Sequence, residues 1–409
     1  MSNTRFFHII LSVRKGIIPI ISFLILSILL PACSNDEPTP NPPDEPAPSL
    51  DRDVKTAILI YAVASNNLNS SFSDDLNESG DLYEMLEAAE QINLNEADVV
   101  IYSVELQGDV QLRRIVKDDA GKPGLQLIKE YDRNTFSTDP KRISEVINDF
   151  IELDKCDRRG LILWSHATGW EPDFSDHIVP IANYSFGADK YNGKYDYCDL
   201  IELNEAIPEG VFDYIWFDCC YMMQIESIYQ LRNKARYFVG SPMEMAGEGT
   251  PYHLVLPLLA RPDYNLADAI EIEARYFINR NIPIAISLLD ATYLDEVMQA
   301  ARLAAKGKRQ NTLGLISYSR TPVGSLYDFS GFTERRGASL GAEWDSDYFS
   351  ELMERLLPCR FAGEKNWSNR PIDPAGYSGL AVHNFNDDGD DVSEYYKQLA
   401  WYRDVYDDF

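Results

Sequence analysis

Apolar stretches of strand length alternate with helix-period patterns along most of this chain. Strand-like runs lie at residues 56–64, 98–106, 160–165, 214–217, 237–240 and 284–289. Apolar positions at helical spacing occupy residues 73–92, 139–151, 199–206, 221–232, 266–280 and 291–305. Strands that alternate with helices predict an α/β fold, in which helices flank a mainly parallel sheet.

Some segments depart from this alternation. Residues 110–131 hold two strand patterns around Gly121-Lys122-Pro123-Gly124, which predicts an antiparallel pair. The polar, turn-rich stretch 171–196 is expected to be a loop. Beyond residue 290 the pattern is weaker, with a strand expected at 379–384 and an aromatic helix at 392–406. We therefore divide the folded part into a main body at 54–290 and a C-terminal α/β extension at 291–409 packed on it.

The first 32 residues have the pattern of a secretory signal peptide. Basic residues precede an apolar run at 17–30, and small residues precede Cys33. The run is shorter than the roughly 20 residues that a membrane-spanning helix needs. Residues 30–33 (Leu-Pro-Ala-Cys) resemble the bacterial lipoprotein box, which implies that Cys33 is lipidated and becomes the first residue of the mature chain.

A stalk is expected next, at residues 33–53. Between residues 36 and 48 it contains six prolines and four acidic residues. Such a composition cannot bury enough apolar surface to fold, and proline favours extended chain. The prediction is an exported body that a lipid anchor tethers to the membrane of the bacterial cell envelope, on its periplasmic side or at the cell surface.

Charge and cysteine content exclude several classes of protein. The 409 residues carry a net charge of −28, so a nucleic-acid partner, which requires basic patches, is not expected. Six cysteines are too few for a disulfide scaffold, and an odd number remains once Cys33 is lipidated, so at least one free thiol is expected. No C-x-x-C spacing points to zinc. Residues 386–391 (NDDGDD) are acidic but lack the ligand spacing of a calcium loop, so we expect no metal and favour a solvated loop over a calcium site.

Two predicted strands end at chemically reactive side chains. Residues 161–164 lead into Ser165 and His166, and residues 214–217 lead into Asp218-Cys219-Cys220. The carboxyl ends of parallel strands gather at one edge of a sheet, and neighbouring strands lie about 4.8 Å apart. A histidine and a cysteine at the ends of adjacent strands can therefore meet. An imidazole beside a thiol promotes the thiolate and can protonate a leaving amine, which is the chemistry of a cysteine protease.

Spacing alone leaves the nucleophile open between Cys219 and Cys220. Side chains alternate along a strand, so Asp218 and Cys220 share one side, and this favours Cys220. A helix expected from residue 221 would also favour a thiolate at Cys220 through its amino end. The backbone N–H groups of Cys220 and Ala167 are the candidates that receive the oxyanion. Asp218 also fits as the cap of the expected helix.

Residues 163–170 (LWSHATGW) and 217–226 (FDCCYMMQIE) resemble the two signatures of clostripain-like cysteine peptidases, within the caspase, legumain and gingipain group. The resemblance covers most of residues 54–409 and is strongest between 160 and 260. It implies a caspase-like fold, with His166 as the base and Cys220 as the nucleophile. It also implies that Asp218 lines a pocket for a basic P1 side chain. Where this chain has Ala167, the family usually has glycine, which allows a positive φ more readily.

The predicted function is therefore a lipid-anchored cysteine endopeptidase that cleaves proteins or peptides after arginine or lysine, without a cofactor. The resemblance also implies self-cleavage between the two catalytic residues, with Lys190 and Lys194 as candidate sites. The main alternative is a non-catalytic surface lipoprotein that binds peptides or glycans in a protease-like cleft. A thiol oxidoreductase is disfavoured because redox folds use C-x-x-C rather than adjacent cysteines.

Overall fold

The computed structural model describes residues 52–72, 80–106, 108–170, 185–308, 311–319, 326–384 and 394–406. These ranges belong to one compact unit, residues 48–409. The expected signal peptide, Cys33 and the stalk up to residue 51 lie outside the described residues. Within those ranges, no helix combines the length and the apolar composition needed to cross a bilayer.

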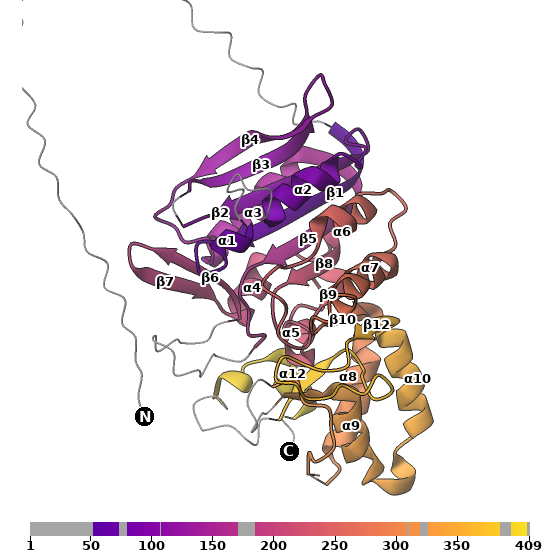
Figure 1. Cartoon of the computed structure of the whole chain (residues 1–409). Helices are drawn as coiled ribbons and strands as arrows, with labels where there is room; N and C mark the ends of the chain where they lie inside the picture. The colour runs from indigo at the N-terminus through magenta and orange to yellow at the C-terminus, as the bar shows by residue number, and fades with distance from the viewer. Residues whose placement is uncertain are drawn as a thin grey trace, which may run out of the picture. The chain divides into compact units, whose positions relative to one another are not determined.

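A nine-stranded sheet forms the centre of this unit (Figure 1). Its strand order is β12-β10-β9-β8-β5-β1-β2-β3-β4. The inner strands pair in parallel, and they are β1 (Arg52–Val63), β2 (Ala97–Val104), β5 (Asp154–Trp164), β8 (Phe212–Asp218) and β9 (Ala235–Gly240). Antiparallel strands complete both edges, namely β3 (Val110–Lys117), β4 (Pro123–Tyr131), β10 (Ala285–Asp290) and β12 (Cys359–Ala362). The predicted α/β class with a mainly parallel sheet is confirmed.

Helices bury both faces of the sheet. One face packs against α2 (Asp81–Ala89), α6 (Tyr252–Leu259) and α7 (Leu266–Ile278). The other packs against α3 (Pro140–Leu153), α4 (Leu200–Ala206), α5 (Ile225–Gln230), α8 (Leu294–Ala305), α9 (Phe329–Ala338), α10 (Ser346–Leu356) and α12 (Ala400–Val405). Along β1, Leu59 and Tyr61 enter one core while Ile58 and Ile60 enter the other, which explains why the run is apolar at every position.

Short elements lie beside the main sheet. They are α1 (Asn69–Phe72), the hairpin of β6 (Phe186–Tyr191) with β7 (Lys194–Cys198), the pair β11 (Leu326–Asp328) with β13 (Ala381–His383), and the 3-10 turns η1 (Ala291–Tyr293) and η2 (Gly341–Glu343). The hairpin corrects the expectation of a loop over 171–196. Residues 185–198 pair as strands because Asn192 and Gly193, both at positive φ, form a tight turn between them.

Local sequence explains several helix starts. α3 begins as predicted, because the Asp139 side chain accepts a hydrogen bond from the Lys141 N–H and Pro140 occupies the first turn. α4 begins with a capping box between Asp199 and Glu202. Both caps place the helix start next to the polar residue that the sequence supplies.

The helix expected over 221–232 is shorter than predicted. α5 begins at Ile225, because Tyr221 has a φ of 62° and cannot continue a helix. The N–H of Tyr221 donates to the Met243 carbonyl and that of Met223 to the Ser241 carbonyl, so these residues pair with the segment after β9 instead.

The C-terminal residues also differ from expectation. The strand at 379–384 is confirmed as β13, but it pairs with β11 and does not extend the main sheet. The aromatic helix expected at 392–406 is interrupted by a turn at 397–399, so α12 begins at residue 400. This region is tied to α5 because buried Glu226 accepts hydrogen bonds from the His383 N–H and the Tyr396 hydroxyl.

The pairing of β5 with β8 depends on a glycine. Gly160 lies opposite the fully buried Tyr214, and a Cβ at Gly160 would lie 2.1 Å from the Cζ of that ring. We expect Gly160→Ala to lower the free energy of unfolding by about 2 kcal/mol, because the ring must move within a packed core. Urea denaturation followed by circular dichroism measures this change.

Gly124→Ala is the matched control, since no atom lies within 4 Å of a Cβ at that position in β4. An equal loss in the two variants would mean that glycine's flexibility, rather than contact with Tyr214, determines the cost.

Candidate active site

The two predicted reactive strand ends lie side by side. β5 and β8 pair in parallel, with Trp164 directly opposite Asp218. His166 lies two residues beyond Trp164, and Cys220 lies two residues beyond Asp218. Beyond the paired strands, the chain therefore continues to the histidine and to the second cysteine from neighbouring points on the carboxyl edge of the sheet.

The two cysteines have different surroundings. Cys219 is buried in the apolar core on one face of the sheet, and this burial raises the pKa of its thiol well above the ordinary value. Cys220 is half-buried, and its Sγ accepts a hydrogen bond from the Met245 N–H at 3.3 Å. Neither thiol forms a disulfide. Cys220 is thus the more accessible thiol of the two.

The backbone turns sharply just after Cys220. Tyr221 holds the left-handed conformation, which is uncommon for a residue with a bulky side chain and is characteristic of strained functional sites. α5 begins only at Ile225, so no helix starts directly after Cys220. The prediction that the amino end of a helix supports a thiolate at Cys220 is therefore wrong. The Met245 N–H supplies a local donor in its place.

His166 is oriented by a residue that sequence patterns did not single out. Its Nε2 lies 2.8 Å from the Asn67 Oδ1. An amide oxygen can only accept, so Nε2 carries the hydrogen and Nδ1 keeps a free lone pair. Burial lowers the pKa of His166, which leaves the ring neutral near pH 7 and able to take a proton.

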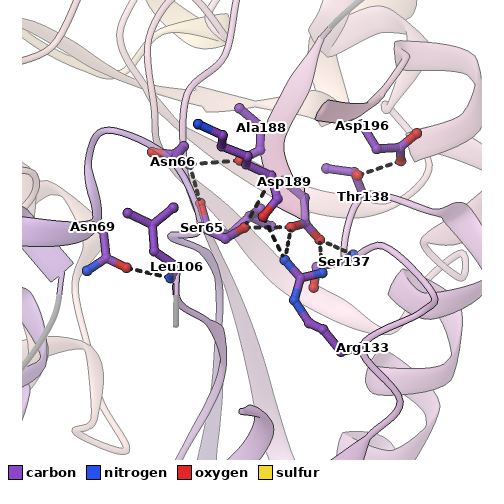
Figure 2. A network of polar contacts seen from close by, with 12 residues as sticks. Ser65, Asn66, Asn69, Leu106, Arg133, Ser137, Thr138, Ala188, Asp189 and Asp196 are labelled. Carbon is purple, nitrogen blue, oxygen red and sulfur yellow. Dashed lines mark hydrogen bonds and ion pairs between the residues drawn. The ribbon is translucent and has the colours of Figure 1, made fainter. Parts of the chain in front are cut away.

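A buried polar network holds the segment that carries Asn67 (Figure 2). The Asn66 side chain donates to the carbonyls of Val63 and Ala188 and accepts from the Leu68 N–H. Next to it, buried Asp189 accepts from Ser65 and from Arg133. These contacts join the end of β1 to the β6–β7 hairpin, and Asn67 follows directly after Asn66 in the chain. Only the folded chain brings these segments together, so no local signal in the sequence marked the residue.

Ala167 adopts a conformation that alanine tolerates. It is not among the described residues with positive φ, and the next positive φ in this loop belongs to Gly169. Ala167 forms an antiparallel bridge with Phe186, in which the Thr168 N–H donates to Ser185 and the Gly187 N–H donates to His166. The N–H of Ala167 takes no part in that ladder. The replacement of glycine by Ala167 therefore imposes no backbone strain here.

Asp218 lies two residues before Cys220 and is almost fully buried. Both of its oxygens accept from the Thr250 N–H, each at 3.1 Å, and Oδ2 accepts from the Tyr252 hydroxyl at 2.8 Å. The carboxylate therefore contacts the segment before α6 and does not cap α5. Burial, opposed by these donors, raises the pKa of Asp218 to about 6.

A second carboxylate lies close to Asp218 and Gly249. The Trp164 indole N–H donates to Asp81 Oδ2 at 2.6 Å, and a Cβ placed on Gly249 would lie 3.0 Å from Asp81 Oδ2 and 3.1 Å from Asp218 Oδ2. Burial, and then the charge of Asp218, raises the pKa of Asp81. The buried Glu273 adds a third acidic group, whose pKa burial also raises. Such a cluster is suited to a cationic group, which would stabilise the charged carboxylates.

Other predicted features lie apart from this centre. The acidic run 386–391 lies outside the described residues, and the part of the chain that is described holds no cluster of His, Cys, Asp and Glu able to bind a metal. Trp164 and Trp170, which the sequence allowed as walls of the site or as core, are both buried. A hollow of about 710 Å³, lined by residues from 311–317, Tyr327 and 370–373, includes neither His166 nor Cys220.

The two lysines considered for self-cleavage lie in the β6–β7 hairpin, opposite Tyr195 and Tyr191. The Lys190 N–H donates to the Ser65 carbonyl, and its own carbonyl accepts from Arg133. Cleavage at Lys190 would therefore require this part of the hairpin to detach first.

Comparison with known proteins gives a family and a fold. The sequence model of the clostripain family (peptidase C11) matches residues 60–330. A secreted C11 cysteine protease from Bacteroides thetaiotaomicron, solved with an irreversible peptide inhibitor, is 24% identical with a TM-score of 0.72, over 87% of this chain and 99% of that one. An inactive zymogen C11 protease from Parabacteroides distasonis is also 24% identical with a TM-score of 0.72, over 86% and 98%. No curated protein matches the chain.

The contrast between the cysteines predicts selective alkylation. Iodoacetamide at pH 7.5 is expected to modify Cys220 at least tenfold faster than Cys219, because Cys219 is buried and its pKa is raised. Peptide mapping by mass spectrometry after timed exposure measures both rates. Buried Cys198 serves as an internal standard for an unreactive thiol. Faster modification of Cys219 than of Cys220 would contradict this assignment.

Proposed function

Because the chain belongs to the clostripain family of cysteine peptidases, we propose that it is an endopeptidase in which Cys220 is the nucleophile and His166 the general base. The observation that supports this proposal is the β5–β8 pairing, in which Trp164, two residues before His166, lies opposite Asp218, two residues before Cys220. The burial of Cys219 supports the choice of Cys220 over its neighbour.

The proposed reaction follows from the hydrogen-bonding groups around His166 and Cys220. His166 Nδ1 takes the proton of the Cys220 thiol, while Asn67 holds Nε2 and fixes the orientation of the ring. The thiolate attacks the peptide carbonyl, and the backbone N–H groups of Ala167 and Cys220 receive the oxyanion. His166 then protonates the leaving amine as the C–N bond breaks, which leaves an acyl-enzyme. Water activated by the same imidazole hydrolyses the thioester and restores Cys220.

We further propose that the enzyme cleaves after arginine or lysine. The support is that Asp218, two residues before Cys220, and Asp81 both lie next to Gly249. A guanidinium or ammonium group beside these carboxylates would be paired in a buried site, where charge-assisted hydrogen bonds are strong. The substrates are therefore proteins or peptides with a basic P1 residue, and the negative charge of the chain favours their encounter.

We propose that the protein is exported and held at the bacterial cell envelope by a lipid on Cys33. The support is the signal-like pattern of residues 1–32 and the lipoprotein box at residues 30–33. One structural relative, the protease from Bacteroides thetaiotaomicron, is described as secreted, which agrees with export. A non-catalytic peptide or glycan binder is less well supported, because Ala167, the residue that favoured it, adopts an unstrained backbone.

The role of each cysteine can be separated by substitution. Cys220→Ala is expected to abolish cleavage of arginyl amide substrates, while Cys219→Ala keeps most of it, since Cys219 only fills apolar space. Release of a fluorescent amine measures kcat/KM, and labelling by an arginine-based thiol-reactive probe counts active sites. The reverse pattern would move the nucleophile to Cys219, and no labelling of the unmodified protein would favour the binder.

Asp218 is expected to control the preference for basic P1 residues. Asp218→Asn should lower kcat/KM for arginyl substrates about 100-fold, as expected when one partner of a buried charge pair is lost. Because the pKa of Asp218 is raised to about 6, its carboxylate becomes protonated as the pH falls through 6, so kcat/KM should decline below that pH. The pH profile of arginyl amide cleavage measures this decline.

Asp213→Asn, at the beginning of the same strand, is the matched control and should leave the profile unchanged. If Asp218→Asn kept both the arginine preference and the acid limb of the profile, the carboxylate would have a structural role only.

A further inference from the structure

We propose that Trp367 forms the wall of a subsite that selects an apolar side chain at P2, the substrate residue immediately before P1. This inference rests on the proposed endopeptidase function and extends it to a second substrate position. Of the six tryptophans, all of which lie in the described ranges, Trp367 is the one that is exposed, at 41%. A large aromatic side chain left in water at the rim of a site is typical of a binding hot spot.

One peptide group joins Trp367 to the nucleophile. The carbonyl of Glu244 accepts a hydrogen bond from the Trp367 indole N–H at 2.8 Å, and the N–H of Met245, in the same peptide group, donates to Cys220 Sγ at 3.3 Å. A planar peptide holds its oxygen and nitrogen roughly 2.3 Å apart. The indole nitrogen therefore lies no more than about 8.5 Å from the sulfur.

Several hydrogen bonds hold the loop that carries Trp367. The side chain of buried Asn366 accepts from the N–H groups of Ser368 and Arg370 and donates to the Ser317 carbonyl. An antiparallel bridge between Lys365 and Pro371 closes the base of the loop. The indole is thus held at a fixed place before substrate arrives, which reduces the entropy cost of binding.

The position of the loop favours the acyl half of the substrate. The segment that contacts Cys220 at Met245 continues to Gly249 and Thr250, which border the Asp218 carboxylate proposed to bind P1. This segment therefore follows the side of the site that holds P1. In an extended peptide, successive residues rise about 3.4 Å, so the P2 side chain falls within reach of the indole.

The surroundings favour an apolar occupant. Met245 and Ala246 are half-exposed on the same segment, and Leu68 packs near Gly247 on its other side. Glu244 and Glu248 lie on the same segment, so the apolar surface here is formed by the side chains of Trp367, Met245, Ala246 and Leu68, while Asp81 and Asp218 are buried. Leucine or an aromatic residue at P2 would cover the indole and remove both surfaces from water.

The test compares acetyl-Leu-Arg and acetyl-Gly-Arg coumarin amides, which carry no residues after P1, with a blocked arginine coumarin amide. Unmodified enzyme should prefer leucine to glycine about tenfold in kcat/KM. Trp367→Ala should reduce that ratio to threefold or less while it changes the single-arginine substrate by less than twofold. Trp367→Phe should restore most of the preference, because a ring remains to contact P2.

An equal loss on all three substrates in Trp367→Ala would overturn the proposal, since it would show that Trp367 only supports the Glu244–Met245 peptide. An unchanged leucine preference would overturn it as well.

A binding measurement separates this proposal from the proposed function. Fluorescein-labelled peptides that differ only by leucine or glycine before arginine are titrated, by anisotropy, into the full chain carrying Cys220→Ala. Tighter binding of the leucine peptide, lost in the added Trp367→Ala change, supports the subsite even if the unmodified protein cleaves nothing. Equal binding of the two peptides, or binding of neither, overturns it.

Discussion

The candidate site depends on the parallel pairing of β5 with β8. Its register places Trp164 opposite Asp218 and so sets the positions of the residues that follow on each strand. A slip of one residue would turn every side chain to the other face of the sheet. Cys220 would then enter the apolar core and Cys219 would face the site. The close contact of Gly160 with Tyr214 fixes this register, because a larger residue cannot face the ring.

The loops around this edge are held by buried polar contacts rather than by regular pairing alone. Asp189 and Asn66 join the end of β1 to the β6–β7 hairpin. These contacts hold the segment that carries Asn67, whose side chain contacts His166. Thr250 and Tyr252 hold Asp218 in the same way. Catalytic geometry needs this kind of support, since side chains on unsupported loops lose orientation. The network also explains why a reactive pair can be built on segments far apart in the chain.

The site combines buried carboxylates with an exposed aromatic side chain. The carboxylates of Asp81, Asp218 and Glu273 are buried, and burial is the main cause of their raised pKa values; the charge of Asp218 adds to the rise for Asp81 and Glu273. Buried like charges are unfavourable in the empty protein, and a cation would relieve that cost. The surface nearby carries the exposed Trp367 and the half-exposed Met245, with Glu244 and Glu248 on the same segment as Met245. A substrate with an apolar residue before a basic one would match both features.

The sequence determined the alternation of strands and helices, the strand ends at His166 and Asp218, and the caps at Asp139 and Asp199. These features depend on neighbours within a few residues, so local pattern contains the information. It also favoured Cys220 through the alternation of side chains along the strand, although the helix expected to support its thiolate begins four residues later than predicted. Tertiary structure alone decided that Asn67 contacts His166, that Asp81 lies near Asp218, and that Trp367 lies near Cys220. Each of these pairs is separated by about a hundred residues or more in the chain, and only the order of strands in the sheet and the packing of distant loops bring them into contact.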